Sequence, residues 1–274
     1  MRKKFLAIVQ CVDSLLSSRN WRRTMFSWKQ AAYCAKLSTY AYQSQEGFNK
    51  VIRHPDTTFF DYGGTQAYAL NSKEEYILVF RGTEPTQWAD IKSDLKFRKV
   101  PSLDVDGKSE GRVHRGFKAA LEMVWDDISR HMRICNASQK KIIITGHSLG
   151  AALATLVAGR LNNPDVELYT YGSPRVGTAK WCKNQKFKHY RFRNNNDIVT
   201  RVPPTWIGFK HHGEMMYFDY KEMYATGSGK MYMLKNWLMG TYKGWFSFAG
   251  WDSFSDHDIT SYYKICKSMM VDNN

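Results

Sequence analysis

The chain has 274 residues, 43% of them hydrophobic and 15% aromatic. It is long and apolar enough to bury one substantial core, so we expect a single domain over residues 1–274. No stretch approaches the roughly 18 uninterrupted apolar residues of a membrane-spanning helix, which argues against an integral membrane protein. Lysine and arginine number 40 against 25 aspartate and glutamate, and the net charge of +15 favours attraction to anionic surfaces.

The N-terminal segment predicts an amphipathic helix over about residues 4–17, because its apolar residues recur at helical spacing. Its first apolar run, from Phe5 to Val9, is shorter than the hydrophobic region of a secretory signal peptide. We therefore expect a protein that is cytoplasmic or exported without a classical signal peptide. Two interpretations of the helix stay open: it lies on a membrane surface, or it packs on the domain, which we favour.

Downstream, helical and strand patterns alternate. Continuous apolar runs such as Tyr76–Phe80 and Ile142–Ile144 indicate strands that are buried on both faces. The expected order is helix 28–42, strands 66–70 and 76–80, helix 113–132, strand 142–144, a helix from 149, strands 167–171, 189–193 and 215–218, and helix 258–267. This alternation predicts an α/β fold, with a mostly parallel central sheet covered by helices on both faces.

The sequence contains no recognisable metal-ligand spacing and no nucleic-acid module. The cysteines are scattered and never spaced as ligand pairs, so they predict neither a disulfide framework nor a zinc site and fit a reducing compartment. The basic residues are dispersed and lack an accompanying Cys/His or RNP-like motif, so we predict no nucleic-acid partner. We expect no metal and no cofactor. The five cysteines are Cys11, Cys34, Cys135, Cys182 and Cys266.

The pentapeptide Gly146-His147-Ser148-Leu149-Gly150 follows a predicted strand directly and opens a helix of small residues. Such a G-x-S-x-G pattern occurs by chance in roughly one chain in ten of this length. Its place between a strand and a helix is much more specific, because a nucleophile elbow requires that setting. The glycines remove side chains that would collide at the strained turn. We predict that Ser148 is a nucleophile; an ordinary glycine-flanked turn is the alternative.

A nucleophilic serine needs a histidine to accept its proton and a carboxylate to hold that histidine's tautomer. With a nucleophile elbow the chain order is serine, then acid, then histidine. His257 precedes the last predicted helix and is our choice of base. Asp197 follows a strand, at the edge of the sheet where α/β sites form, and is our choice of acid. The other histidines after the elbow are expected to be structural or exposed: His189, His211 and His212. The carboxylates that compete with Asp197 on chain order alone are Asp165, Asp219, Asp252 and Asp256.

Further motifs accompany the elbow in a fixed order, and together they are highly specific. With them the chain resembles the class 3 lipases over roughly residues 59–267. This fungal-lipase-like family also includes plant phospholipases A1 and feruloyl esterases. The motifs that carry the resemblance are Val79–Thr83, Val113–Phe117, the elbow with its Ala-Ala-Leu-Ala helix, Tyr171–Gly177, Asn196–Val199 and Asp256–His257. The resemblance implies an α/β-hydrolase fold.

The same resemblance implies roles for individual residues. Ser148, Asp197 and His257 are expected to form the catalytic triad. The oxyanion hole is expected at Thr83 and at the backbone N–H of Leu149. Leu149 follows the nucleophile at a helix N-terminus, where the helix dipole favours negative charge.

A lid is implied over about residues 84–97. Trp88, Ile91 and Leu95 recur there at spacings of three and four, which is one apolar face of a helix. Two interpretations stay open: the helix moves to uncover an acyl groove, which we favour, or it is fixed on the core. The aromatic segment 231–254 is expected to be an acyl-chain wall, a membrane-contact surface or ordinary core.

The leading hypothesis is a carboxylic ester hydrolase that acts on lipids, either a triacylglycerol lipase or a phospholipase A1, through an acyl-enzyme intermediate. The expected partners are a lipid or ester substrate and, peripherally, an anionic membrane surface. One alternative is an esterase on small or aromatic esters. The other is a catalytically silent lipase-like module for binding or signalling.

Overall fold

The computed structural model describes residues 26–83, 97–103, 109–219, 221–225 and 256–272. Its centre is a seven-stranded sheet. The strands are β1 (Thr57–Tyr62), β2 (Thr65–Asn71), β3 (Glu75–Phe80), β6 (Lys141–His147), β7 (Glu167–Tyr171), β9 (Lys188–Asn194) and β11 (Glu214–Phe218). They lie in the order β1-β2-β3-β6-β7-β9-β11. The first three pair antiparallel and all later neighbours pair parallel, which confirms the predicted α/β fold.

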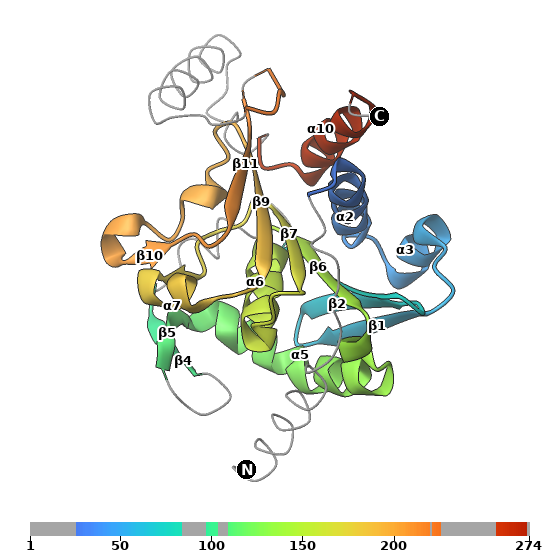
Figure 1. The fold of residues 1–274 in the computed structure, drawn as a ribbon, viewed down its shortest axis with the longest axis horizontal. Helices are drawn as coiled ribbons and strands as arrows, with labels where there is room; N and C mark the ends of the chain where they lie inside the picture. The colour runs from blue at the N-terminus through green and yellow to red at the C-terminus, as the bar shows by residue number, and fades with distance from the viewer. Residues whose placement is uncertain (1–25, 84–96, 104–108, 220, 226–255, 273–274) are drawn as a thin grey trace.

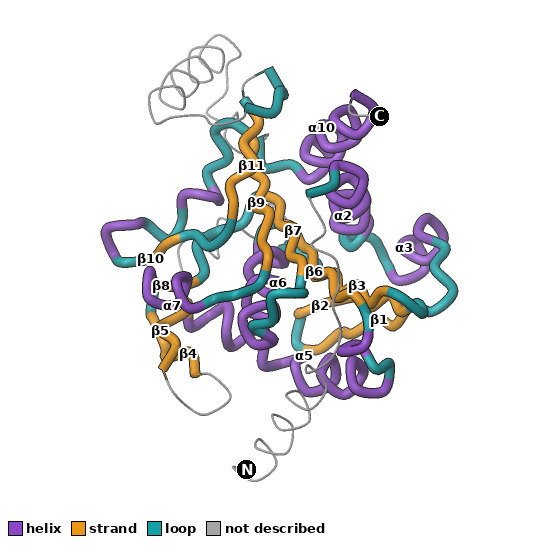
Figure 2. The backbone as a smooth tube through the Cα atoms, viewed as in Figure 1, coloured by secondary structure: helices purple, strands orange, loops and turns teal. Residues whose placement is uncertain are grey.

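Helices cover both faces of this sheet, as Figure 1 shows. The helices are α2 (Trp28–Tyr40), α3 (Gln45–Ile52), α5 (Arg115–Ile134), α6 (Leu149–Leu161), α7 (Ala179–Asn184) and α10 (Ile259–Asp272). Residues of α5 and α6 pack in one core with one face of the sheet, and residues of α2 and α10 pack in a second core with the other face. In Figure 2, α2 and α10 lie side by side.

Alternation along β6 explains why its sequence is apolar without interruption. Ile142 and Ile144 belong to the core beneath α5 and α6, whereas Ile143 belongs to the core beneath α2 and α10. Successive side chains of a strand point to opposite faces, and here both faces are buried. The strand ends at the turn before α6, so the site described below stands at the carboxyl end of a strand that is buried on both faces.

A second, four-stranded sheet was not among the sequence-based expectations. Its strands are β4 (Lys99–Leu103), β5 (Ser109–His114), β8 (Gly177–Thr178) and β10 (Phe209–Lys210), in the order β10-β8-β5-β4. The predicted helix start at Val113 is therefore wrong, because Val113 pairs with Val100 and Gly177 in this sheet. The helix begins at Arg115, and His114 caps it by accepting a hydrogen bond from the amide of Phe117 (3.3 Å).

Several sequence-based expectations fall outside the described residues. These are the N-terminal helix, the aromatic segment 231–254 and all but the last residue of the expected lid, including Trp88, Ile91 and Leu95. Within the described ranges, no helix combines the length and apolar character needed to span a bilayer. The described cysteines are free thiols: Cys34, Cys135, Cys182 and Cys266.

Candidate active site

Ser148 occupies a strained turn between β6 and α6. Its backbone has φ 59° and ψ −126°, a combination that L-residues adopt rarely. The turn is possible only because the flanking residues have no side chains. A Cβ on Gly146 would lie 2.5 Å from the backbone of Gly150, and a Cβ on Gly150 would lie 2.4 Å from the carbonyl oxygen of Phe80. The turn thus has the strand-to-helix geometry of a nucleophile elbow.

The structure brings Ser148, His257 and Asp197 into one chain of hydrogen bonds. His257 Nε2 lies 2.9 Å from Ser148 Oγ, and His257 Nδ1 lies 2.9 and 3.0 Å from the two carboxylate oxygens of Asp197. A carboxylate can only accept, so Nδ1 carries the proton and Nε2 accepts the serine hydroxyl. Ser148 and Asp197 have no exposed surface and His257 retains 4%. Exclusion of water strengthens each of these bonds.

Asp197 is held by two further donors. The hydroxyl of Tyr262 in α10 donates to its Oδ2 over 2.6 Å, and the amide of Val199 donates to its Oδ1 over 2.9 Å. Burial and the neighbouring charge of Asp197 raise the pKa of Tyr262, so the phenol stays a donor at neutral pH. The amide of Asn194 in turn donates to the tyrosine oxygen over 2.9 Å. Tyr262 was missed by sequence reasoning, since it looks like any aromatic residue of an amphipathic helix.

The loops that carry the acid and the base are joined directly. The carboxylate of Asp256 accepts hydrogen bonds from the side chain of Asn195 (3.1 Å) and the amide of Asn196 (3.0 Å). Asn194 donates to the carbonyl of Asp256 over 3.1 Å. Asp256 therefore fixes His257 relative to Asp197. The other competitors lie elsewhere: Asp165 is exposed, Asp219 accepts from the amides of Lys221 and Met223, and Asp252 is outside the described residues.

His147, immediately before the serine, ties the elbow to the base. Its Nε2 lies 2.7 Å from the backbone carbonyl of His257, and its Nδ1 lies 2.8 Å from the hydroxyl of Tyr42. The carbonyl can only accept, so Nε2 carries the proton and Nδ1 accepts from Tyr42. Burial lowers the pKa of His147 well below its usual value, with a smaller contribution from His257, and the ring is neutral. The variable position of the G-x-S-x-G pattern gave no sign of this contact.

Gly172 lets the backbone pass directly beneath the acid–base pair. Its φ is 58°, and a Cβ there would lie 2.7 Å from the ring of His257 and 2.8 Å from Oδ2 of Asp197. Any side chain would displace the pair. The glycine belongs to the Tyr-Gly-Ser-Pro-Arg motif of the sequence. That motif contributed to the family resemblance, but the sequence alone assigned no role to Gly172.

The two positions expected to form an oxyanion hole lie at neighbouring strand ends. Thr83 follows β3 and is half-buried, and β3 pairs in parallel with β6, with Phe80 opposite Gly146. A Cβ on Gly82 would lie 2.6 Å from the carbonyl oxygen of His147, so this segment passes close to the elbow. Leu149 opens α6. Its amide has no partner within the helix, because the first N–H groups of a helix lack one.

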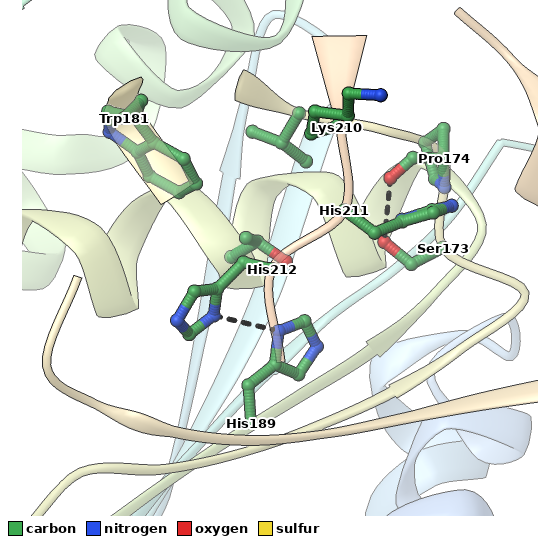
Figure 3. Close-up of a pocket in the computed structure, with 9 residues that line it drawn as sticks. Ser173, Pro174, Trp181, His189, Lys210, His211 and His212 are labelled. Atoms are coloured by element: carbon green, nitrogen blue, oxygen red, sulfur yellow. Dashed lines mark hydrogen bonds between the residues drawn. The ribbon is translucent and has the colours of Figure 1, made fainter. Parts of the chain in front are cut away.

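The remaining histidines after the elbow do not join this hydrogen-bond chain. Figure 3 shows His189, His211 and His212 around a small cavity, where His189 Nδ1 lies 3.3 Å from His212 Nδ1. His189 also contacts the hydroxyl of Thr170 (2.8 Å), and His211 contacts the carbonyl of Thr200 (2.8 Å). Across the part of the chain that the structure describes, no group of three His, Cys, Asp or Glu side chains is arranged to hold a metal.

The sheet and this geometry are those of an α/β-hydrolase fold, with Ser148 at the strand-to-helix turn after β6. Residues 77–206 match the model of the family described as lipase (class 3). Over this stretch, just under half of its length, the chain is similar to the class 3 lipases.

Curated relatives share this part of the sequence. A secreted mono- and diacylglycerol lipase of Fusarium solani is 35% identical over 169 residues, which are 57% of this chain and 48% of that protein. The toxin TseL of Vibrio cholerae is 38% identical over 188 residues, which are 53% of this chain and 28% of the toxin. The chain thus spans about half, or less, of the length of these relatives.

Solved structures share the fold. A triacylglycerol lipase described as having a serine-protease triad superposes with a TM-score of 0.60 at 24% identity, covering 69% of this chain and 79% of that one. Lipase II from Rhizopus niveus gives a TM-score of 0.57 at 27% identity, covering 69% and 80%. At these identities the likeness establishes the architecture, a mostly parallel sheet with helices on both faces.

Proposed function

We propose that the chain is a lipolytic carboxylic ester hydrolase in which Ser148, His257 and Asp197 act as a catalytic triad. The observation that carries the proposal is the continuous hydrogen-bond chain from Ser148 Oγ through the His257 ring to the Asp197 carboxylate, with links of 2.9 Å on each side of the ring. The serine is presented by a strained elbow, which is a costly arrangement that stability alone does not require.

The geometry supports the following chemistry. His257 Nε2 accepts the proton of Ser148 as the oxygen attacks the ester carbonyl, and Asp197 stabilises the imidazolium that forms. The imidazolium then protonates the departing alcohol, leaving an acyl group on Ser148. Water, deprotonated by the same nitrogen, attacks this acyl-enzyme and releases the fatty acid.

The tetrahedral intermediates carry a negative oxygen, and the proposal assigns its stabilisation to Thr83 and the Leu149 amide. The Leu149 N–H stands in the first turn of α6, where the partial positive charge of the helix dipole adds to the hydrogen bond. Loss of one oxyanion donor typically lowers the rate about 10²- to 10³-fold.

The substrate class is inferred from the relatives. The curated proteins most similar to this chain include mono- and diacylglycerol lipases and a lipase of Rhizomucor miehei. We therefore propose glycerides or glycerophospholipids as substrates, with contact to an anionic membrane surface as the route to them. An esterase acting on small soluble esters is the competing proposal.

The test compares the full chain with Ser148→Ala on p-nitrophenyl esters of short and long chains, and on triglyceride emulsions and phosphatidylglycerol vesicles. A triad serine predicts a loss of about 10⁵- to 10⁶-fold in kcat. Release of fatty acid from emulsions or vesicles identifies a lipolytic enzyme, and the preferred lipid separates lipase from phospholipase. Turnover of short soluble esters alone supports the competing esterase.

Ser173→Ala is the matched control. Ser173 is also buried, at 1% exposure, but its hydroxyl donates to the carbonyl of Pro174 rather than contacting His257. This variant should retain activity within about 10-fold of the wild type. Equal inactivity of wild type and Ser148→Ala on every substrate, with detergent present, would leave a catalytically silent module as the function.

A further inference from the structure

An exposed tryptophan stands on the turn that leads into the four-stranded sheet. Trp206 leaves 85% of its surface to solvent, more than any other large hydrophobic side chain in the described residues. It sits in a single 3₁₀ turn, Thr205–Ile207, between Pro204 and Gly208. Figure 1 shows this turn beside β10 at the left edge of the molecule. Tryptophan is costly to leave in water, and its rigid amphipathic ring is well suited to an apolar–aqueous boundary.

Basic side chains lie next to the end of this turn and along the four-stranded sheet that follows it. A Cβ placed on Gly208 would lie 3.1 Å from the ammonium group of Lys99. The same ammonium group lies 5.5 Å from the ring centre of Phe209. Lys210, in the same short strand as Phe209, is exposed. Arg112 is exposed on β5 and donates to the carbonyl of Lys99 over 2.8 Å. The described acid on this sheet is Glu110, whose carboxylate accepts from Asn162 (3.1 Å).

We propose that the turn 205–207 and its basic rim (Lys99, Arg112 and Lys210) form a docking surface for an anionic lipid surface. Trp206 inserts among the headgroups while the rim binds the acidic lipids. One apolar anchor combined with several basic residues supplies the two signals that stable membrane attachment needs. Duplex nucleic acid would use the same charges, but its bases are stacked inside the helix and offer no apolar layer for a tryptophan held out on a turn.

The docking surface is linked to the candidate active site by a short, well-anchored stretch of chain. Trp206 follows Asp197 by nine residues, a length that spans at most roughly 30 Å. The stretch is compacted further, because Val199 contacts Asp197 and Arg175 donates to the carbonyl of Pro203 over 2.9 Å. Docking through Trp206 would therefore hold the site close to the lipid surface. The biological role of this docking rests on the proposed function. Vesicle binding itself can be measured without ester hydrolysis.

The experiment measures co-sedimentation of the full chain with phosphatidylglycerol and phosphatidylcholine vesicles, using Ser148→Ala throughout so that no lipid is hydrolysed. We expect binding to phosphatidylglycerol that weakens as salt rises, because exposed charges are screened. Adding Trp206→Ser should weaken the partition coefficient about 10-fold. Adding Lys99→Gln and Lys210→Gln together should weaken it by at least about as much.

Ile134→Ser is the matched control, since Ile134 is 72% exposed at the end of α5, outside the proposed surface. It should bind as the parent does. If Trp206→Ser binds as tightly as Ile134→Ser, the docking surface is wrong, even when binding is salt-sensitive. The docking surface is also wrong if phosphatidylglycerol vesicles do not bind, whether or not an RNA homopolymer binds. If the wild type hydrolyses no ester but Trp206→Ser still loses vesicle binding, this inference stands and the proposed function is overturned.

Discussion

Two groups of histidines differ in what lies next to them: the first is the buried His257, and the second is the buried His189 with the half-buried His211 and His212. His257 lies against the carboxylate of Asp197. His189, His211 and His212 instead lie within electrostatic range of Arg191, and burial is the main cause that lowers the pKa of each. Arg191 is itself 6% exposed, and burial, with Arg193 and Arg175 nearby, lowers its pKa to about 9. In the described residues no carboxylate forms an ion pair with this arginine.

The difference separates a site that can move a proton from one that only fills space. A carboxylate beside an imidazole stabilises the charged ring, so the ring can accept a proton during a reaction. Burial and the neighbouring arginine disfavour the charged imidazole, and they lower the pKa values of His189, His211 and His212. The cavity between the three histidines has a volume of about 10 Å³, room for about one water molecule. Of these two groups, His257 is the one whose ring lies against a carboxylate that can stabilise its charged form.

The largest expected effect tests the carboxylate directly. Asp197→Asn should lower kcat by about 10⁴-fold on any ester that the wild type hydrolyses, because an amide favours the wrong imidazole tautomer. Asp219→Asn is the control, since Asp219 is buried at 6% exposure but accepts hydrogen bonds from backbone amides. It should lose less than about 10-fold. Similar losses in the two variants would mean that Asp197 acts through the fold and has no special role.

The hydroxyl that holds Asp197 should have a smaller effect. Tyr262→Phe removes the 2.6 Å hydrogen bond to Oδ2 and leaves the packing of the ring intact. Hydrogen bonds to charged groups contribute about 1.5–3 kcal/mol, so we expect kcat to fall about 10-fold with KM unchanged. Steady-state kinetics on a soluble ester separate the two constants. Tyr263→Phe, one residue along and half-buried, is the control. A change in KM alone would contradict a positioning role for Tyr262.

These two residues also show how far sequence reasoning reaches. Ser148, Asp197 and His257 could be selected because chain order and motif context are local properties of a sequence. Tyr262 could not, since its hydroxyl meets Asp197 only after α10 packs beside α2. The same holds for the contact between His147 and the carbonyl of His257. The four-stranded sheet was missed because two of its strands have only two residues each, too few for a period to be seen.

Stability at low pH should report the other histidines. The folded pKa of His189 lies well below 6.5, its usual value, which the unfolded chain keeps. As pH falls below about 6.5 the unfolded state binds protons first, so folding stability is lost on acidification. His189→Gln should reduce this loss by up to about 1 kcal/mol per pH unit. Urea unfolding between pH 7 and pH 5 measures it, with His54→Gln on the surface as the control. Parallel stability profiles for wild type and His189→Gln would contradict the assignment.

The smallest expected effect concerns the arginine that faces these histidines. The Nε of Arg191 is buried without a hydrogen-bond partner in the described residues, and an uncompensated buried charge costs stability. Replacing such a charge by an apolar side chain of similar length is often neutral or stabilising by about 1 kcal/mol or more. Arg191→Met should therefore leave the free energy of unfolding unchanged or raise it.

Arg160→Met is the contrasting variant, because Arg160 pairs with Glu122 and stands 4.7 Å from the ring centre of Trp125. It should lose about 0.5 kcal/mol or more. If Arg191→Met instead cost about 3 kcal/mol, as breaking a buried ion pair does, a negative partner would have to lie beside Arg191. His257 and Arg191 would then each have a carboxylate partner. The two sites would differ only in which basic group the carboxylate contacts.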